Sequence, residues 1–88
     1  MPSARRSTIF HTTMQTVVRS VMTLLVNGEQ RTIASGATVG DLLRAVGLDP
    51  RTVVVEHNRT ILRDRAAFDA FPLSDGDVVE IVHFVGGG

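Results

Sequence analysis

Residues 22–48, MTLLVNGEQRTIASGATVGDLLRAVGL, decide the fold of this chain. They begin with an apolar run that reaches Asn27-Gly28, a pair that supplies the two positive φ angles of a tight hairpin turn. A second alternating run follows, so the pattern predicts strands over about 22–27 and 29–34. The side chains expected on the inner face of this hairpin are Met22, Leu24, Val26 and Ile33.

A helix follows the hairpin, and both of its ends are marked. Thr38 is placed to cap the N-terminus, with Asp41 three residues on, near the positive end of the helix dipole. Gly47 is placed to end the helix in the left-handed conformation. One apolar stripe runs at helical spacing through Val39, Leu42, Leu43 and Val46. Gly40 lies inside the first turn and is unfavourable for a helix.

Strand-like patterns return after Pro50. Residues 52–58, TVVVEHN, are dense in β-branched side chains and predict a third strand, and residues 60–63 predict a short fourth one after a turn. The segment 64–73 is ambiguous, with a short helical turn that buries Phe68 and Phe71 as one reading. Residues 74–77, SDGD, have the composition of a turn.

The last strand is predicted over residues 78–85, VVEIVHFV. The order strand, strand, helix, strand, short strand, strand predicts an α+β fold, a mixed sheet of four to five strands with one main helix on one face. In the simplest arrangement the last strand pairs beside the first, in the middle of the sheet. Alternation along it directs Val79 and Ile81 toward the helix and Val82 and Phe84 to the opposite face. His83 is expected at the rim of the core, in a hydrogen-bonded structural role.

Composition excludes several classes of function. The chain has 88 residues, enough for one small domain, and no cysteine, which excludes disulfides, thiolate nucleophiles and cysteine-type zinc sites. Its three histidines are far apart in sequence, a poor start for a metal site. The formal net charge is zero, so general binding to nucleic-acid phosphates is not indicated. No apolar run is long enough to span a membrane.

The charge is unevenly distributed. Residues 1–21 carry three arginines and no acid, whereas the remainder carries six arginines and nine acids, and there is no lysine anywhere. The composition of 1–21 resembles a transit peptide. We favour a disordered extension or a start codon assigned too early, since Met14 and Met22 are later possible starts. The domain proper is therefore expected over 22–85, followed by a flexible glycine tail over 86–88.

No catalytic constellation stands out. The serines and threonines have no base at a recognisable spacing, and the glycines do not form a phosphate-binding loop. Asp75 and Asp77 flank Gly76 in what reads as a turn, because the remaining ligands of a calcium loop are missing. Glu56 and Glu80 lie in strands, where an outward-facing carboxylate is the ordinary explanation. No bound cofactor or metal is expected.

The C-terminal glycines remain as the candidate functional group. The α-carboxyl of Gly88 has a reference pKa of about 3.3–3.7, so it is ionised at neutral pH and is able to attack an activated phosphate. Gly86 and Gly87 have no Cβ, which allows the tail to thread a narrow channel. The exposed pair Val82 and Phe84 lies beside the tail and is interpreted as part of a docking patch.

Several segments resemble the ThiS family, the sulfur carriers of bacterial thiamine biosynthesis. They are VNGE in the first hairpin, GATVGDLL at the start of the helix, VVVEHN, and above all DGDVVEIVHFVGGG at the C-terminus. The resemblance covers residues 22–88. It implies a ubiquitin-like β-grasp fold in a cytoplasmic protein that is a co-substrate and not an enzyme.

The resemblance also implies a mechanism. An E1-like enzyme (ThiF type) adenylates the Gly88 carboxylate with ATP, sulfur from a cysteine-desulfurase pathway replaces the adenylate, and the thiocarboxylate is delivered to thiazole synthase (ThiG type). Gly86 and Gly87 match the glycines that enter the partners' active sites. The chain departs from the family pattern at Arg59, where glycine is common, in the following LRDRAAF segment, and in residues 1–21.

Three alternatives stay open at this point. The related carrier of molybdopterin synthesis shares the fold and the Gly-Gly end, although the terminal sequence favours the thiamine branch. A ubiquitin-like modifier would be joined to target lysines through Gly88. A plain β-grasp binding module would use neither Gly87 nor Gly88.

Overall fold

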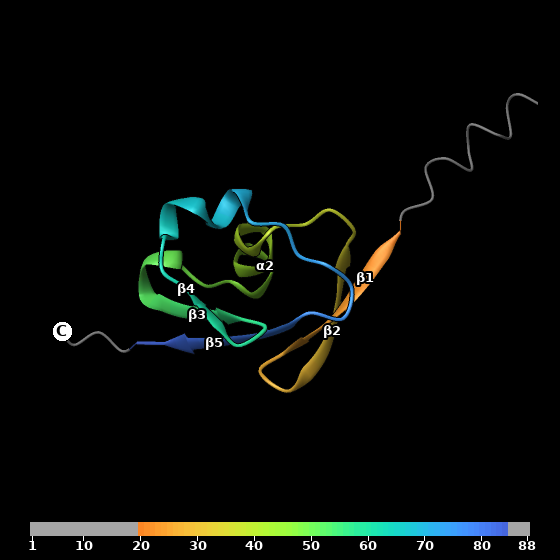
Figure 1. The fold of residues 1–88 in the computed structure, drawn as a ribbon, viewed down its shortest axis with the longest axis horizontal. Coiled ribbons are helices and arrows are strands. Elements are labelled where there is room, and N and C mark those ends of the chain that lie inside the picture. The colour runs from red at the N-terminus through yellow and green to blue at the C-terminus, as the bar shows by residue number, and fades with distance from the viewer. Residues whose placement is uncertain (1–19, 85–88) are drawn as a thin grey trace, which may run out of the picture.

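The computed structural model describes residues 20–84, which form a five-stranded mixed sheet in the order β2-β1-β5-β3-β4 (Figure 1). The strands and the helix are β1 (Val21–Val26), β2 (Glu29–Ala34), α2 (Val39–Val46), β3 (Val53–His57), β4 (Thr60–Leu62) and β5 (Val78–His83). Short 3₁₀ segments occupy Pro50–Thr52 and Arg65–Ala70. The predictions for the N-terminal extension up to residue 19 and for the glycine tail lie outside the described residues.

The first hairpin forms as predicted, with β1 starting one residue earlier than expected. β1 and β2 pair antiparallel, and Asn27 and Gly28 have φ angles of 50° and 83°. The Asn27 side chain also reaches β5, because its Nδ2 donates to the Ile81 carbonyl at 3.1 Å and its Oδ1 accepts from the Ile81 N–H at 2.6 Å. The turn therefore extends the contact between β1 and β5 beyond the end of β1.

Helix α2 has the predicted caps at both ends. The Thr38 hydroxyl accepts from the Asp41 N–H at 3.2 Å, and the Asp41 carboxylate accepts from the Thr38 N–H at 2.9 Å. Gly47 ends the helix with a φ of 77°. These bonds satisfy backbone groups that a helix leaves open at its ends.

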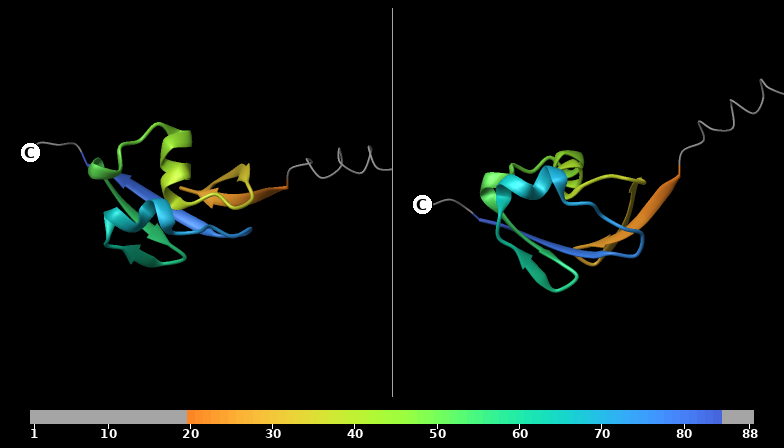
Figure 2. Two further views of the ribbon diagram at one scale, coloured as in Figure 1. Left: turned by 90° about the horizontal axis from the view of Figure 1, so that it is seen from above. Right: turned by 45° about the horizontal axis from the view of Figure 1, so that its top comes forward.

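Gly40 has a packing role that sequence alone did not show. Helix α2 and the Arg65–Ala70 segment lie on the same side of the sheet (Figure 2). Gly40 is buried where these two segments meet. A Cβ at this position would lie 2.9 Å from the Asp69 Cγ and 3.1 Å from the Asp69 Cα. The close approach of the two segments therefore requires glycine, which explains its presence in the first helical turn.

The core lies between α2 and one face of the sheet. β5 is central, parallel to β1 and antiparallel to β3, as predicted. Its inward residues Val79 and Ile81 are 0% and 7% exposed. The other buried apolar residues are Met22, Leu24, Val26, Ala37, Val39, Leu42, Leu43, Val53, Val55, Phe68 and Leu73. Burial of this set is the main driving force for folding.

The second hairpin joins β3 and β4 through Asn58 and Arg59, which have φ angles of 47° and 76°. Asn58 also holds the start of β5, because its Oδ1 accepts from the Val78 N–H and its own N–H donates to the Val78 carbonyl, both at 2.8 Å. The ambiguous segment after β4 is the predicted short helical turn. It buries Phe68 fully and Phe71 partly.

Among residues 20–84, no helix is both long enough and apolar enough to cross a membrane.

Candidate functional site: the outer sheet face

The face of the sheet opposite α2 is the candidate functional site, and β5 lies at its centre. Since Val79 and Ile81 point toward α2, the alternate residues of β5 point away from it. Val82 is 61% exposed and Phe84 is 42% exposed, as the alternation predicted. Their role in docking a partner stays a prediction.

Four further exposed apolar residues belong to this same face. They are Val21, Leu25, Ile61 and Val78. The alternation along the last strand already directed Val78 to this face, and the other three were missed in the sequence. Leu25 of β1 lies directly beside Val78 of β5, and Ile61 of β4 lies directly opposite Glu56 of β3. The signal was available, because the inward alternation of β1 leaves Val21 and Leu25 outward, but β4 was too short to show a period. We call this surface the outer sheet face: Val21, Leu25, Val54, Glu56, Ile61, Val78, Glu80, Val82 and Phe84.

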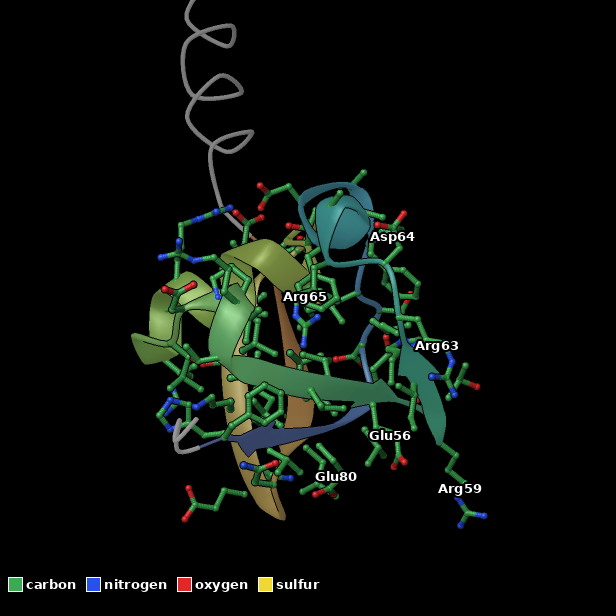
Figure 3. The ribbon with its side chains drawn as sticks, turned by 90° about the vertical axis from the view of Figure 1, so that its left-hand side faces the viewer. Glu56, Arg59, Arg63, Asp64, Arg65 and Glu80 are labelled. Carbon is green, nitrogen blue, oxygen red and sulfur yellow. The ribbon has the colours of Figure 1, made fainter. Side chains whose placement is uncertain are left out.

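Glu56 and Glu80 lie within this apolar surface. They are direct Cα partners in the antiparallel ladder of β3 and β5, and the next pair along that face is Val54 with Val82. Figure 3 shows both carboxylates extending from the same side of the sheet. The prediction that these glutamates face outward is therefore correct.

His83 does not lie where the sequence analysis placed it. The residue is exposed, and no hydrogen bond among residues 20–84 involves its ring. The prediction of a hydrogen-bonded position at the rim of the core is wrong. The direct partner of His83 across β3 and β5, Val53, is fully buried, but the His83 side chain itself is exposed, and Ile81 is the last buried residue of β5.

The histidine with a structural role is His57. Its Nε2 lies 2.7 Å from the Asp77 carboxylate, which also accepts from the Asn58 side chain at 3.1 Å and from the Ser74 N–H at 2.9 Å. Burial opposes ionisation of Asp77, but these hydrogen bonds outweigh it and lower the pKa of the carboxyl. The network fixes the turn that leads into β5.

The turn reading of Asp75, Gly76 and Asp77 agrees with this geometry. Asp75 accepts from the Thr23 N–H at 2.7 Å, so both carboxylates are occupied by backbone and side-chain donors. Within residues 20–84, no group of three or more histidine or acidic side chains is arranged to hold a metal ion.

A separate cavity of about 340 Å³ lies between β4 and the Arg65–Ala70 segment. Its lining is mostly apolar, with two charged residues: Ile61, Leu62, Arg63, Asp64, Ala67, Phe68 and Phe71. No local pattern predicted this cavity, because it forms between the 3₁₀ segment and the short strand β4. Ile61 belongs both to this cavity and to the outer sheet face.

The predicted functional glycines, Gly86, Gly87 and Gly88, follow β5 directly in sequence but lie outside the described residues. The structure therefore places the predicted docking pair Val82 and Phe84 in one surface, and it leaves the arrangement of the tail a prediction.

Comparison with known proteins identifies similar chains. The model described as "ThiS family" matches residues 24–88. Proteins named "Thiazole synthase" from Paramagnetospirillum magneticum and Magnetococcus marinus are 42% and 37% identical over 67 residues, which are 76% of this chain. The chain spans only 20% of the length of each of these two relatives. "Sulfur carrier protein ThiS" from Bacillus subtilis is 45% identical over 51 residues, which are 58% of this chain and 76% of that protein.

A solved structure shows the same fold. The crystal structure of a thiamine biosynthesis protein (ThiS) from Geobacter metallireducens superposes with a TM-score of 0.64 and 43% sequence identity. The match covers 76% of this chain and 100% of that one. Together with the five-stranded mixed sheet and the helix α2 that packs on it, the match confirms the predicted ubiquitin-like β-grasp fold.

Proposed function

Because this chain belongs to the ThiS family, we propose that it carries sulfur for thiamine biosynthesis on its terminal glycine, Gly88. The observation that carries the proposal is the match of the family model through residue 88, which includes the glycines directly after β5. In this role the chain is a protein co-substrate, and the folded domain serves to present the tail.

The proposed chemistry replaces one oxygen of the Gly88 carboxylate by sulfur. A carboxylate oxygen attacks the α-phosphate of ATP in an E1-like enzyme, and pyrophosphate leaves. A persulfide from the cysteine-desulfurase pathway then displaces AMP and forms an acyl disulfide with Gly88. A thiol cleaves that S–S bond, which releases the thiocarboxylate and leaves the thiol joined to the carrier of the persulfide in a new disulfide. The E1-like partner binds the ATP, and Gly86 and Gly87 enter its active site because their lack of a Cβ allows a narrow channel.

The folded domain contributes a fixed root for the tail. β5 is bonded to strands on both sides, and the Asn27 and Asn58 side chains hold its backbone at Ile81 and Val78. The glycine tail therefore continues in sequence from a strand whose position is fixed by these bonds. Val82 and Phe84 extend the contact with each partner beyond the tail.

Thiazole synthase is the proposed recipient of the sulfur. In the relatives from P. magneticum and M. marinus, the matched region makes up a fifth of one longer chain named "Thiazole synthase". That arrangement supports a shared task for the carrier domain and thiazole synthase. The names of these relatives also favour the thiamine branch over the molybdopterin branch.

Intact-mass analysis tests the function. The full chain is incubated with an E1-like ThiF-type enzyme, ATP and a sulfur donor system. We expect a mass change equal to replacing one oxygen by sulfur, and we expect none in a variant that lacks Gly88. A variant with Glu29→Gln, on the β1–β2 hairpin, serves as the control that keeps the modification. Absence of the sulfur-containing species from the wild-type chain contradicts the proposal.

A further inference from the structure

The acidic side chains of this protein fall into two classes by their use in the fold. All nine acids of the sequence lie within the described residues. Each of the six aspartates accepts a hydrogen bond or forms an ion pair there: Asp41, Asp49, Asp64, Asp69, Asp75 and Asp77. Among residues 20–84, no such partner is found for the three glutamates, Glu29, Glu56 and Glu80. The fold itself therefore does not use the glutamate carboxylates.

Two of these glutamates face each other. Glu56 and Glu80 are direct partners across β3 and β5, a position in which Cβ atoms are about 4.5–5.5 Å apart and like charges destabilise the sheet. The nearby arginines do not relieve this repulsion. Arg59 and Arg63 lie around the β3–β4 hairpin, and Figure 3 shows their guanidinium groups apart from both carboxylates.

The surroundings of the pair are apolar. Val54 and Val82 form the adjacent cross-strand pair, and Ile61 lies beside Glu56 on β4. The outer sheet face holds all six of the exposed large apolar side chains described among residues 20–84. Exposed apolar side chains gathered on one face of a sheet are typical of an interaction site.

A partner that covers this face must compensate the two negative charges of Glu56 and Glu80. Apolar contact excludes water, and a carboxylate that loses its water without gaining a hydrogen-bonded cation is costly to bury. A purely apolar partner surface would therefore be rejected, whereas a surface with a cation opposite the pair would be accepted. Arginine suits the position, because its planar fork has enough donors to bond two carboxylates at once.

We propose that the outer sheet face docks thiazole synthase through one arginine or lysine of that partner, set among apolar side chains, which bridges Glu56 and Glu80. The identity of the partner rests on the proposed function, and the chemistry of its surface rests on the geometry of the face. β5 connects the two, since it carries Glu80, Val82 and Phe84 and leads into the glycine tail that the partner receives. The glutamate pair thus selects which partner surface is accepted.

Binding measurements with matched charge variants test this inference. The affinity of the full chain for a ThiG-type thiazole synthase is measured for wild type, the double variant Glu56→Gln/Glu80→Gln, and the control Glu29→Gln. Glu29 has the same side chain and is exposed like Glu80, whereas Glu56 is half-buried, and it lies at the β1–β2 turn, opposite the inward residue Val26. We expect the double variant to bind at least about tenfold more weakly, and the control to bind like wild type.

Two further measurements separate docking from misfolding. The double variant is expected to unfold at the same or a higher temperature than wild type, because the like-charge pair is removed. Its affinity is also expected to depend less on salt than that of wild type, because a charge pair across the interface is lost. Equal affinities of wild type and the double variant, or equal weakening in the control, would overturn the proposal.

The occupant itself is also tested. Residues 1–19 carry Arg5, Arg6 and Arg19, so the chain's own N-terminal segment is the competing occupant. If the variant R5Q/R6Q/R19Q changes the melting temperature in wild type but not in the E56Q/E80Q background, that segment covers the face and the proposal is wrong. Failure of sulfur loading in the mass assay contradicts the function instead, so the two failures are distinguishable.

Discussion

At the scale of single residues, Arg59 stands in a backbone conformation that suits glycine. Its φ of 76° is in the left-handed region, which costs an L-residue roughly 1–2 kcal/mol. Replacement by glycine removes this strain but raises the entropy of the unfolded chain, which offsets about 0.5–1 kcal/mol. We expect Arg59→Gly to raise the free energy of unfolding by about 0.5–1 kcal/mol, measured by urea denaturation.

The neighbouring residue provides the contrast. Asn58 also has a positive φ, of 47°, but its side chain bonds the Val78 N–H and Asp77. Asn58→Gly is therefore expected to lower stability. A gain in both variants would show that backbone strain alone governs this turn.

Asp77 makes stability depend on acid pH. Its pKa is lowered in the folded protein, so its ionised form contributes stability that is present above the unfolded pKa of about 3.9 and is lost as the pH falls through the folded pKa. Asp77→Asn leaves the His57 and Ser74 donors without a charged acceptor. We expect a loss of about 1–3 kcal/mol at pH 7.

The measurement is urea denaturation at pH 7 and pH 3. The difference between wild type and Asp77→Asn is expected to shrink at the lower pH, because protonation of Asp77 in the unfolded chain, near pH 3.9, removes part of the stability that the ionised form contributes. An equal difference at both pH values would show that the carboxylate charge is not the stabilising feature.

At the scale of secondary-structure elements, α2 and the Arg65–Ala70 segment pack closely only because residue 40 is glycine. Alanine is the better helix former by about 1 kcal/mol, but its Cβ would collide with Asp69. Asp69 would have to rotate, and its ion pair with Arg44, at 3.0 Å, would be lost. We expect Gly40→Ala to destabilise the protein, measured by thermal and urea denaturation.

A double-mutant cycle identifies the cause. Asp69→Ala removes the carboxyl group that a Cβ at residue 40 would meet, so Gly40→Ala is expected to cost less in that background, with a coupling of about 1 kcal/mol. Some destabilisation is expected to remain in that background, because a Cβ at residue 40 would still lie 3.1 Å from the Cα of residue 69. If the changes in the free energy of unfolding from Gly40→Ala and Asp69→Ala were additive, the Asp69 side chain would not be the cause of the destabilisation.

Local signals predicted most of the elements, and long-range contacts account for what they did not predict. The Asn27-Gly28 turn, the Thr38 cap and Gly47 each act through residues a few positions away, so their patterns were readable. The extent of the outer sheet face was not, because it requires knowing which strands are neighbours. The role of Gly40 and the exposure of His83 depend on which segments from elsewhere in the chain pack against them. No local sequence pattern predicts that packing.

At the scale of the whole molecule, the outer sheet face runs between the two points where the chain enters and leaves the domain. Leu25 and Val78 are neighbours in the parallel pair of β1 and β5, so Val21 and Val82 extend from them toward opposite ends (Figure 1). Their exposures are 62% and 61%. They therefore form a matched pair of test positions, one beside the tail and one far from it.

Val82→Ser is expected to weaken partner binding and slow sulfur loading of Gly88 by about fivefold to tenfold, since it removes apolar contact next to the tail. Val21→Ser is expected to have a smaller effect on both, because Val21 lies at the other end of the face. Loading rates at limiting E1-like enzyme provide the measurement, with melting temperatures to confirm that both variants fold. An equal effect of the two substitutions would remove the distinction between the ends of the face.

The asparagine contacts on β5 also bear on how the domain responds to force. A partner that draws in the tail pulls β5 along its own axis, parallel to β1 and antiparallel to β3. In that direction the force shears the hydrogen bonds that join β5 to β1 and β3. The bonds from Asn27 and Asn58 to β5 resist the same movement, so these bonds are loaded together and not one after another. The domain is therefore expected to resist traction applied to the end of β5.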